Sequence, residues 1–122
     1  MNVKNRWGRI GLVFALTAVT VDSGAAPLYC QGTIQKMLMY SGGEVMMFGS
    51  WRGDWTTICK TDGSIGGVPT EVCLSWYAAA LSARINAKPV TVYYADAAAA
   101  TCATLPTYTS APTMGYFMID GP

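Results

Sequence analysis

The chain has 122 residues with a formal net charge of +1, 12% charged residues and 11% aromatic residues. This length has room for one domain. From Ala26 onward, five Lys and Arg residues stand against six Asp and Glu residues, a net charge of −1. Without clustered basic residues the sequence argues against nucleic-acid binding. Low charge together with many aromatic residues also argues against a disordered chain.

The amino terminus has the three parts of a secretory signal peptide. A basic stretch comes first, formed by Lys4, Arg6 and Arg9. Residues 10–21 are uncharged and mostly apolar, but too few to span a bilayer as a helix. The small residues Ser23-Gly24-Ala25 then favour cleavage before Ala26. We therefore expect a signal peptide over 1–25, a single domain over 26–122, and a secreted or periplasmic protein with no stable membrane span.

Four cysteines lie in the expected mature part: Cys30, Cys59, Cys73 and Cys102. An even number in an exported chain indicates a disulfide framework, for which four cysteines allow three pairings. We favour Cys59–Cys73, which closes a glycine-rich loop, together with Cys30–Cys102, which joins the first strand to a late segment. A zinc site is not expected, because the chain has no histidine and no Cys-x-x-Cys pair. We predict no metal and no cofactor.

The domain begins at Leu28–Tyr40 with a first strand, in which residues 33–40 alternate imperfectly before the turn signal Ser41-Gly42-Gly43. A second strand over Glu44–Phe48 completes a hairpin. Turn signals and β-forming residues predict three further strands, over Trp55–Cys59, Val90–Tyr94 and Tyr116–Ile119.

Between the third and fourth strands the apolar period changes to that of a helix, predicted over about 70–87. Its expected buried face consists of Leu74, Tyr77, Ala78, Leu81 and Ile85. Thr70 is the expected N-cap, Glu71 suits the positive amino-terminal end, and Pro89 stops the helix.

The element order is three strands, a helix and two strands. This order is typical of a five-stranded OB-type Greek-key barrel, with the helix plugging one end, so we predict a mostly β fold of this type. An open α+β sheet with one packed helix is the alternative. Neighbours such as Met46 and Met47 point to opposite faces of a strand, so one of them should face outward, which indicates an oligomer interface.

Enzymatic chemistry has little support in this sequence. No histidine is present to act as a general base, and the cysteines are best used in disulfides. The carboxylates are scattered, and Glu44 and Glu71 have ordinary positions on a strand surface and in a helix first turn. We therefore predict no catalytic residues and a protein that is not an enzyme.

The best candidate for ligand binding is the loop Ser50–Trp55. Trp51 and Trp55 could stack on sugar rings, while Arg52 and Asp54 hydrogen-bond to hydroxyl or carboxylate groups. Alternatively, Trp55 faces the core and the two charged residues form a weak surface pair. Tyr108, in a loop bounded by prolines, is a further candidate, unless that loop is only an ordered crossover covering the barrel.

Several segments resemble the B subunits of AB5 toxins, with the subtilase-cytotoxin and pertussis-like branch nearest. They are Ile58–Thr61, the glycine-rich loop up to Cys73, the helix ending in Ala83-Arg84, and Lys88–Val92. The chain is also similar to small exported bacterial proteins of unknown role with this cysteine pattern. The resemblance covers roughly 59–94. It implies an OB fold, a ring of five subunits, and binding to cell-surface glycans that are often sialylated; it assigns no sugar-binding residue here.

These observations predict an exported, non-enzymatic binding module that forms a homo-oligomer and binds a cell-surface glycan or glycoprotein; the resemblance implies that the oligomer is a pentamer. The alternative function is that of a structural or inhibitory protein that binds another protein. The same tryptophan and arginine loop would then serve as the interface.

Overall fold

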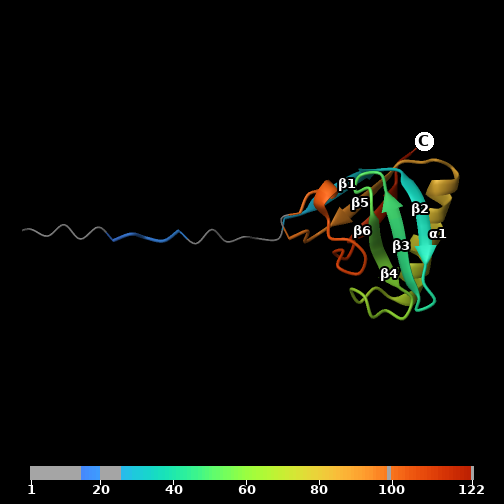
Figure 1. Cartoon of the computed structure of the whole chain (residues 1–122), viewed down its shortest axis with the longest axis horizontal. Coiled ribbons are helices and arrows are strands. Elements are labelled where there is room, and N and C mark those ends of the chain that lie inside the picture. The colour runs from blue at the N-terminus through green and yellow to red at the C-terminus, as the bar shows by residue number, and fades with distance from the viewer. Residues whose placement is uncertain (1–14, 20–25, 99, 122) are drawn as a thin grey trace, which may run out of the picture.

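The computed structural model describes residues 15–19, 26–98 and 100–121, and shows two small antiparallel sheets with one α-helix (Figure 1). The predicted signal peptide lies mostly outside the described residues. Residues 15–19 within it have no regular secondary structure and are exposed, so the signal peptide stays a prediction. Within the described ranges, no helix combines the length and apolarity needed to cross a membrane.

The first sheet has the strand order β1-β5-β6, with β1 at Leu28–Gly32, β5 at Val90–Tyr94 and β6 at Tyr116–Ile119. Cys30 lies opposite Val92, which lies opposite Phe117 on the other side, and these three side chains face the core. The predicted fourth and final strands are confirmed with their bounds.

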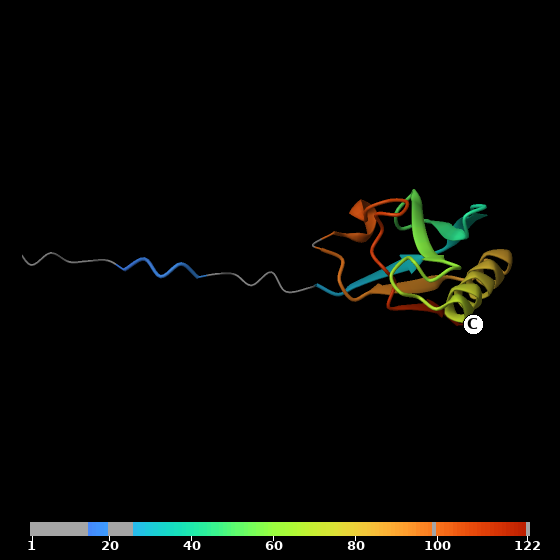
Figure 2. The same ribbon diagram turned by 90° about the horizontal axis from the view of Figure 1, so that it is seen from below.

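The second sheet has the order β2-β3-β4, with β2 at Ile34–Met39, β3 at Glu44–Gly49 and β4 at Trp55–Lys60. The predicted hairpin is confirmed: the Gly43 N–H donates to the Tyr40 carbonyl at 2.9 Å, and Gly43 takes a φ of 94° that suits glycine. Figure 2 shows the two sheets as separate layers whose strands run in different directions.

The described part of the chain forms six strands where five were predicted, because the first predicted strand divides at Thr33. Its first half, β1, pairs in one sheet and its second half, β2, pairs in the other. Thr33 is held at the crossing point by Ser50, whose N–H donates to the Thr33 carbonyl at 2.9 Å. The Ser50 hydroxyl also accepts from the Thr33 N–H at 3.0 Å.

A closed five-stranded barrel is not formed by the described residues. No ladder joins the two sheets among these residues; a single parallel bridge, between Thr56 of β4 and Tyr108, links the second sheet to the segment before β6. The fold is therefore mostly β with one helix, built as two sheets around a shared core.

Helix α1 spans Thr70–Ile85 and contacts β2, β4 and β6, so it lies across one end of both sheets. The prediction that Thr70 is the N-cap is wrong. Pro69 occupies that position, and Thr70 begins the helix while its hydroxyl donates to the Thr61 carbonyl at 2.6 Å. The helix ends before Ala87, whose φ of 49° turns the chain toward β5.

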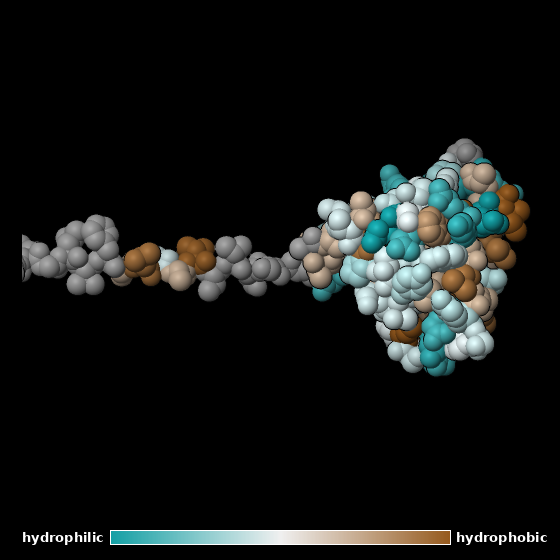
Figure 3. Space-filling model, viewed as in Figure 1, coloured by the Kyte–Doolittle hydropathy of each residue, from teal (hydrophilic) through white to brown (hydrophobic). Residues whose placement is uncertain are grey.

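The predicted buried face of α1 is wrong in part: Tyr77 does pack against the core, but both ends of the predicted face are exposed. Leu74 and Ile85 are 47% and 70% exposed, and the fully buried helix residues are Cys73, Ala80 and Ala83. Cys73 is bonded to Cys59 on β4, and the two alanines permit close approach of the helix. The helix therefore turns the side that carries Cys73 toward the sheets. Brown apolar surface gathers in Figure 3 at the edge where Figure 1 places α1.

Both favoured disulfides are present, Cys30–Cys102 and Cys59–Cys73, each with its Cα atoms 5.6 Å apart. The first joins β1 to the short 3₁₀ turn η1 at Cys102–Thr104, and the second joins β4 to α1. Each sheet therefore has one covalent link to a segment packed against it.

The core lies between the two sheets and the helix. Its largest fully buried side chains are Tyr94, Met47, Ile58 and Leu105. The Tyr94 hydroxyl forms no hydrogen bond with the described residues, and burial raises the pKa of this phenol to about 12. Tyr94 is therefore neutral in the folded protein at any physiological pH.

Candidate functional site

The predicted loop between β3 and β4 is a tight turn. The Gly53 N–H donates to the Gly49 carbonyl at 2.9 Å, and Gly53 has a φ of 68°. Trp51 is half-buried and packs against the core, and its buried indole N–H donates no hydrogen bond to any described residue. A Cβ atom on Gly49 would lie 2.5 Å from the Trp51 ring, so this ring covers Gly49 closely. One face of the Trp51 ring therefore packs against the protein itself.

The charged residues of this loop are engaged within the protein. The Arg52 Nε donates to the Leu105 carbonyl at 2.7 Å, and an Asp54 oxygen accepts from the Trp55 N–H at 2.7 Å. The described residues form no ion pair between Arg52 and Asp54. Arg52 therefore fastens the loop to the segment that leads to Tyr108.

Trp55 is half-buried and lies opposite Phe48 on the next strand. Their rings meet edge to face with centroids 5.6 Å apart, and the Lys36 ammonium lies 5.0 Å from the Phe48 centroid. Neither ring belongs to the main core, so the alternative that Trp55 faces the core does not describe this structure. Trp55 is part of the outer face of the second sheet.

Tyr108 lies on a crossover whose backbone is fixed while its side chain is exposed. Its backbone is fixed to β4: its N–H donates to the Trp55 carbonyl at 2.8 Å, and its carbonyl accepts from the Thr57 hydroxyl at 2.7 Å. Its side chain is nevertheless 45% exposed, and its φ of 53° is unusual for a non-glycine residue. The crossover is ordered, and it presents the tyrosine ring outward.

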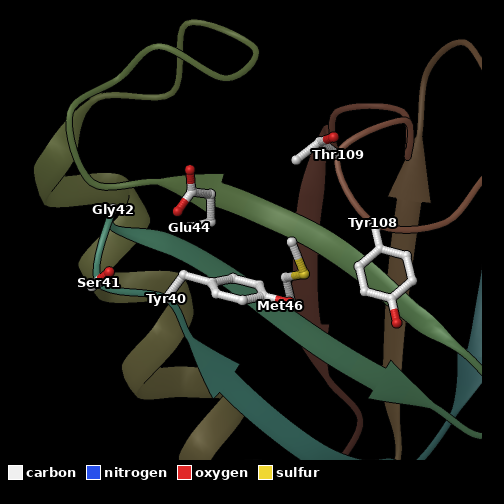
Figure 4. Close-up of a pocket in the computed structure, with 7 residues that line it drawn as sticks. All are labelled: Tyr40, Ser41, Gly42, Glu44, Met46, Tyr108 and Thr109. Atoms are coloured by element: carbon white, nitrogen blue, oxygen red, sulfur yellow. The ribbon is translucent and has the colours of Figure 1, made fainter.

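An open groove of about 530 Å³ lies beside Tyr108 on the outer face of the second sheet (Figure 4). It is lined by the hairpin turn, by β3 and by the crossover, through Tyr40, Ser41, Gly42, Glu44, Met46, Tyr108 and Thr109. Figure 4 shows the Tyr40 and Tyr108 rings on the two sides of Met46. Tyr40 is 46% exposed, much like Tyr108, whereas Met46 between them is 2% exposed.

The two methionines of β3 do point to opposite faces, as predicted. Met47 belongs to the main core and Met46 lines the groove. Because Met46 is almost fully covered, it supplies no exposed oligomer interface, and it forms the groove floor instead.

The polar end of the groove carries a small charge network. The Lys60 ammonium lies 3.4 Å from an oxygen of Glu44 and 3.4 Å from an oxygen of Asp62. Asp62, and then Glu44, raise the pKa of Lys60, while hydrogen bonds from Ser64 are the main cause of a lowered Asp62 pKa. The network holds two carboxylates and one ammonium.

Of the five predicted site residues, only Tyr108 lines the groove. Trp51, Arg52, Asp54 and Trp55 do not line it, although Arg52 donates to the Leu105 carbonyl in the crossover that carries Tyr108. The sequence reasoning missed Tyr40, Glu44 and Met46. Tyr40 could have been found as an aromatic residue directly before a Ser-Gly-Gly turn, since such turns are exposed.

Two further observations complete the description of the site. The described residues contain no group of three or more acidic or cysteine side chains placed to hold a metal ion. No protein-family model, curated protein or solved structure matches the chain.

Proposed function

We propose that this protein is an exported, non-enzymatic carbohydrate-binding module, and that the groove between Tyr40 and Tyr108 holds the sugar. The observation that carries the proposal is the groove itself, in which two half-exposed aromatic rings flank a covered floor beside a carboxylate. Shallow clefts with aromatic walls and a few polar groups are typical of ligand sites.

The chain topology supports an OB-type relationship for this fold. One strand run crosses from one sheet to the other at Thr33, the helix lies at one end, and the segment before β6 bridges back to β4. OB folds bind oligosaccharides and oligonucleotides on the second and third strands of the barrel and the loops beside them. The groove lies between the corresponding hairpin turn, strand and crossover, and the near-neutral charge favours a sugar over a nucleic acid.

The chemistry of the groove suits a pyranose ring. Tyrosine faces pack against the apolar C–H side of a sugar, and each ring keeps a hydroxyl for hydrogen bonding. Glu44 accepts hydrogen bonds from sugar hydroxyls, and Ser41 and Thr109 add neutral donors and acceptors.

We also propose that the protein forms a homo-oligomer and, more specifically, a ring of five subunits like that of the toxins. The exposed side chains of Leu74 and Ile85 on α1 support it, since they leave apolar helix surface uncovered in one chain. Several copies of one weak site would raise the avidity for a glycan-covered surface.

The test is a glycan array followed by calorimetry with the oxidised protein beginning at Ala26. We expect Tyr40→Ala and Tyr108→Ala each to weaken binding by about ten-fold or more, since loss of a stacked ring costs on the order of 1–3 kcal/mol. Tyr116→Ala on the other sheet is the matched control, because that tyrosine is 41% exposed and far from the groove lining. Absence of any glycan signal from the wild-type protein in its native assembly would reject the proposal.

Binding to another protein is the second candidate function. The observation that favours it is the edge strand β6, on which Tyr116, Met118 and Ile119 are exposed. Capture of one defined protein that free sugars fail to displace, and that Tyr116→Ala releases, would favour this function over the first.

A further inference from the structure

The charge of the groove restricts which sugars it can take, and this inference rests on the proposed function. Among the described residues that line it, Glu44 is the one charged side chain. The remaining lining groups are neutral tyrosines, hydroxyls, a glycine and a thioether. A carboxylate is an acceptor only, so it requires donors from a ligand.

The nearest cation does not reverse this preference. Lys60 lies between Glu44 and Asp62 at 3.4 Å from each, so one ammonium already faces two carboxylates. The summed formal charge of the three residues is −1. The two carboxylates also raise the pKa of Lys60, which keeps the ammonium charged and paired.

Two other cations near this face are also engaged. Lys36 lies over the Phe48 ring at 5.0 Å, and Arg52 donates to the Leu105 carbonyl at 2.7 Å. Neither residue lines the groove. An acidic sugar placed there would bring its carboxylate near Glu44 without meeting a cation in the lining.

The hairpin turn positions the Glu44 carboxylate within the groove. A Cβ atom on Gly42 would lie 2.7 Å from one Glu44 oxygen and 3.2 Å from the other. The carboxylate therefore lies directly against Gly42. A side chain at position 42 would displace the carboxylate. One Glu44 oxygen faces Lys60, as the ion pair shows, so the carboxylate is held in a fixed place for a ligand hydroxyl.

We propose that the groove selects a neutral pyranose and rejects sugars that carry a carboxylate or sulfate. Hydroxyl groups of the neutral sugar donate to Glu44, and the ring packs against Tyr40 and Tyr108. An anionic substituent is disfavoured by like-charge repulsion, which strongly suppresses wrong partners at such sites. This specificity differs from the sialylated glycans implied by the toxin resemblance.

The experiment compares matched pairs of oligosaccharides that differ only in a terminal sialic acid, using the oxidised protein in its native assembly. We expect the neutral member to bind at least about ten-fold more tightly, with a smaller difference at high salt because screening weakens the repulsion. Equal or tighter binding of the sialylated member would overturn this inference and leave the proposed function in place. Binding of neither member, or of any other glycan on the array, would overturn both.

A charge-neutral variant sharpens the test. Glu44→Gln keeps the side-chain size and removes the negative charge, so we expect the preference for the neutral sugar to shrink by several-fold. Glu71→Gln, in the exposed first turn of α1, is the matched control and should leave the preference unchanged. An unchanged preference in Glu44→Gln would overturn the role assigned to this carboxylate, and the wild-type comparison needs no variant to fold.

Discussion

The outer faces of the two sheets carry tyrosines in opposite arrangements. On the first sheet, Tyr29, Tyr93 and Tyr116 form one row across the three strands, with successive ring centroids 5.0 Å apart and interplanar angles of 35° and 23°. On the second sheet, Tyr40 and Tyr108 stand on either side of Met46, and neither forms an aromatic pair with a described residue.

This difference is the reason why the proposed sugar site lies on the second sheet, although exposed tyrosines are present on both. Rings in the row cover one another's faces, while separated rings leave their faces free for a ligand. Polar side chains on the first sheet are likewise paired with one another. Thr91 accepts a hydrogen bond from Gln31 at 3.2 Å and donates one to Asp120 at 2.9 Å. We therefore place the proposed recognition site on the second sheet and expect the row on the first sheet to stabilise the fold.

The largest predicted effect concerns the disulfide of each sheet. Cys30–Cys102 closes a separation of 72 residues and Cys59–Cys73 one of 14. Replacing both cysteines of a pair by alanine should lower the free energy of unfolding by about 4 kcal/mol for the first and about 3 kcal/mol for the second, because the longer loop gains more entropy on unfolding. Chemical denaturation of the two double variants measures this, and the reverse order would contradict it.

The second prediction compares two glycines that lie against aromatic rings. Gly49→Ala would push on Trp51, and Gly115→Ala would push on Tyr93 at 2.7 Å. We expect Gly49→Ala to lower the free energy of unfolding by about 1–3 kcal/mol, as overpacking does, and Gly115→Ala to cost less because Tyr93 faces outward and can shift. Denaturation curves give both values, and the tryptophan emission should change only for Gly49→Ala.

The third prediction distinguishes a tyrosine that stabilises the fold by stacking from one that is proposed to bind the sugar. Tyr93→Leu loses two ring pairs, so it should lower the free energy of unfolding by roughly 1–2 kcal/mol and leave sugar binding unchanged. Tyr40→Leu should do the opposite, with binding weakened and stability nearly unchanged. If either variant affected both properties equally, the division of roles between the two sheets would be wrong.

The smallest predicted effect is an acid dependence at Asp62, in the turn that follows β4. Hydrogen bonds from Ser64 hold the Asp62 pKa below its ordinary value of 3.8. The stabilisation is complete above that value and is lost as the pH falls through the lower folded pKa, because protonation removes the acceptor charge. An NMR titration of the carboxyl carbon should give a midpoint below 3.8, and a midpoint at or above it would contradict the prediction.

The sequence predicted those features that depend on local pattern. Turn residues and β-forming stretches located the hairpin, β5 and β6, and the cysteine spacing favoured the pairing that the structure has. The division at Thr33 was missed because it depends on hydrogen bonds to Ser50, which is distant in sequence. The helix face was misjudged because apolar period alone ignores the bond of Cys73 to β4.

The candidate site was predicted only in part, for a related reason. Tyr108 was identified from its proline-bounded loop, but its partner Tyr40 belongs to a turn far away along the chain. The parallel bridge between Thr56 and Tyr108 is what brings the crossover to the groove, and a single bridge leaves no period in the sequence. Aromatic residues such as Trp51 and Trp55 were conspicuous, yet their rings pack against the protein itself.

The attachment of the crossover has a consequence for the thermodynamics of recognition. The segment is held by Cys102 to β1, by the Leu105 carbonyl to Arg52, and by the Tyr108 backbone to β4. A wall held at three points is already ordered before a ligand arrives, so association has little loop entropy to lose. Most of the free energy of the contacts with the proposed sugar then contributes to the affinity. This matters for a groove that is so shallow.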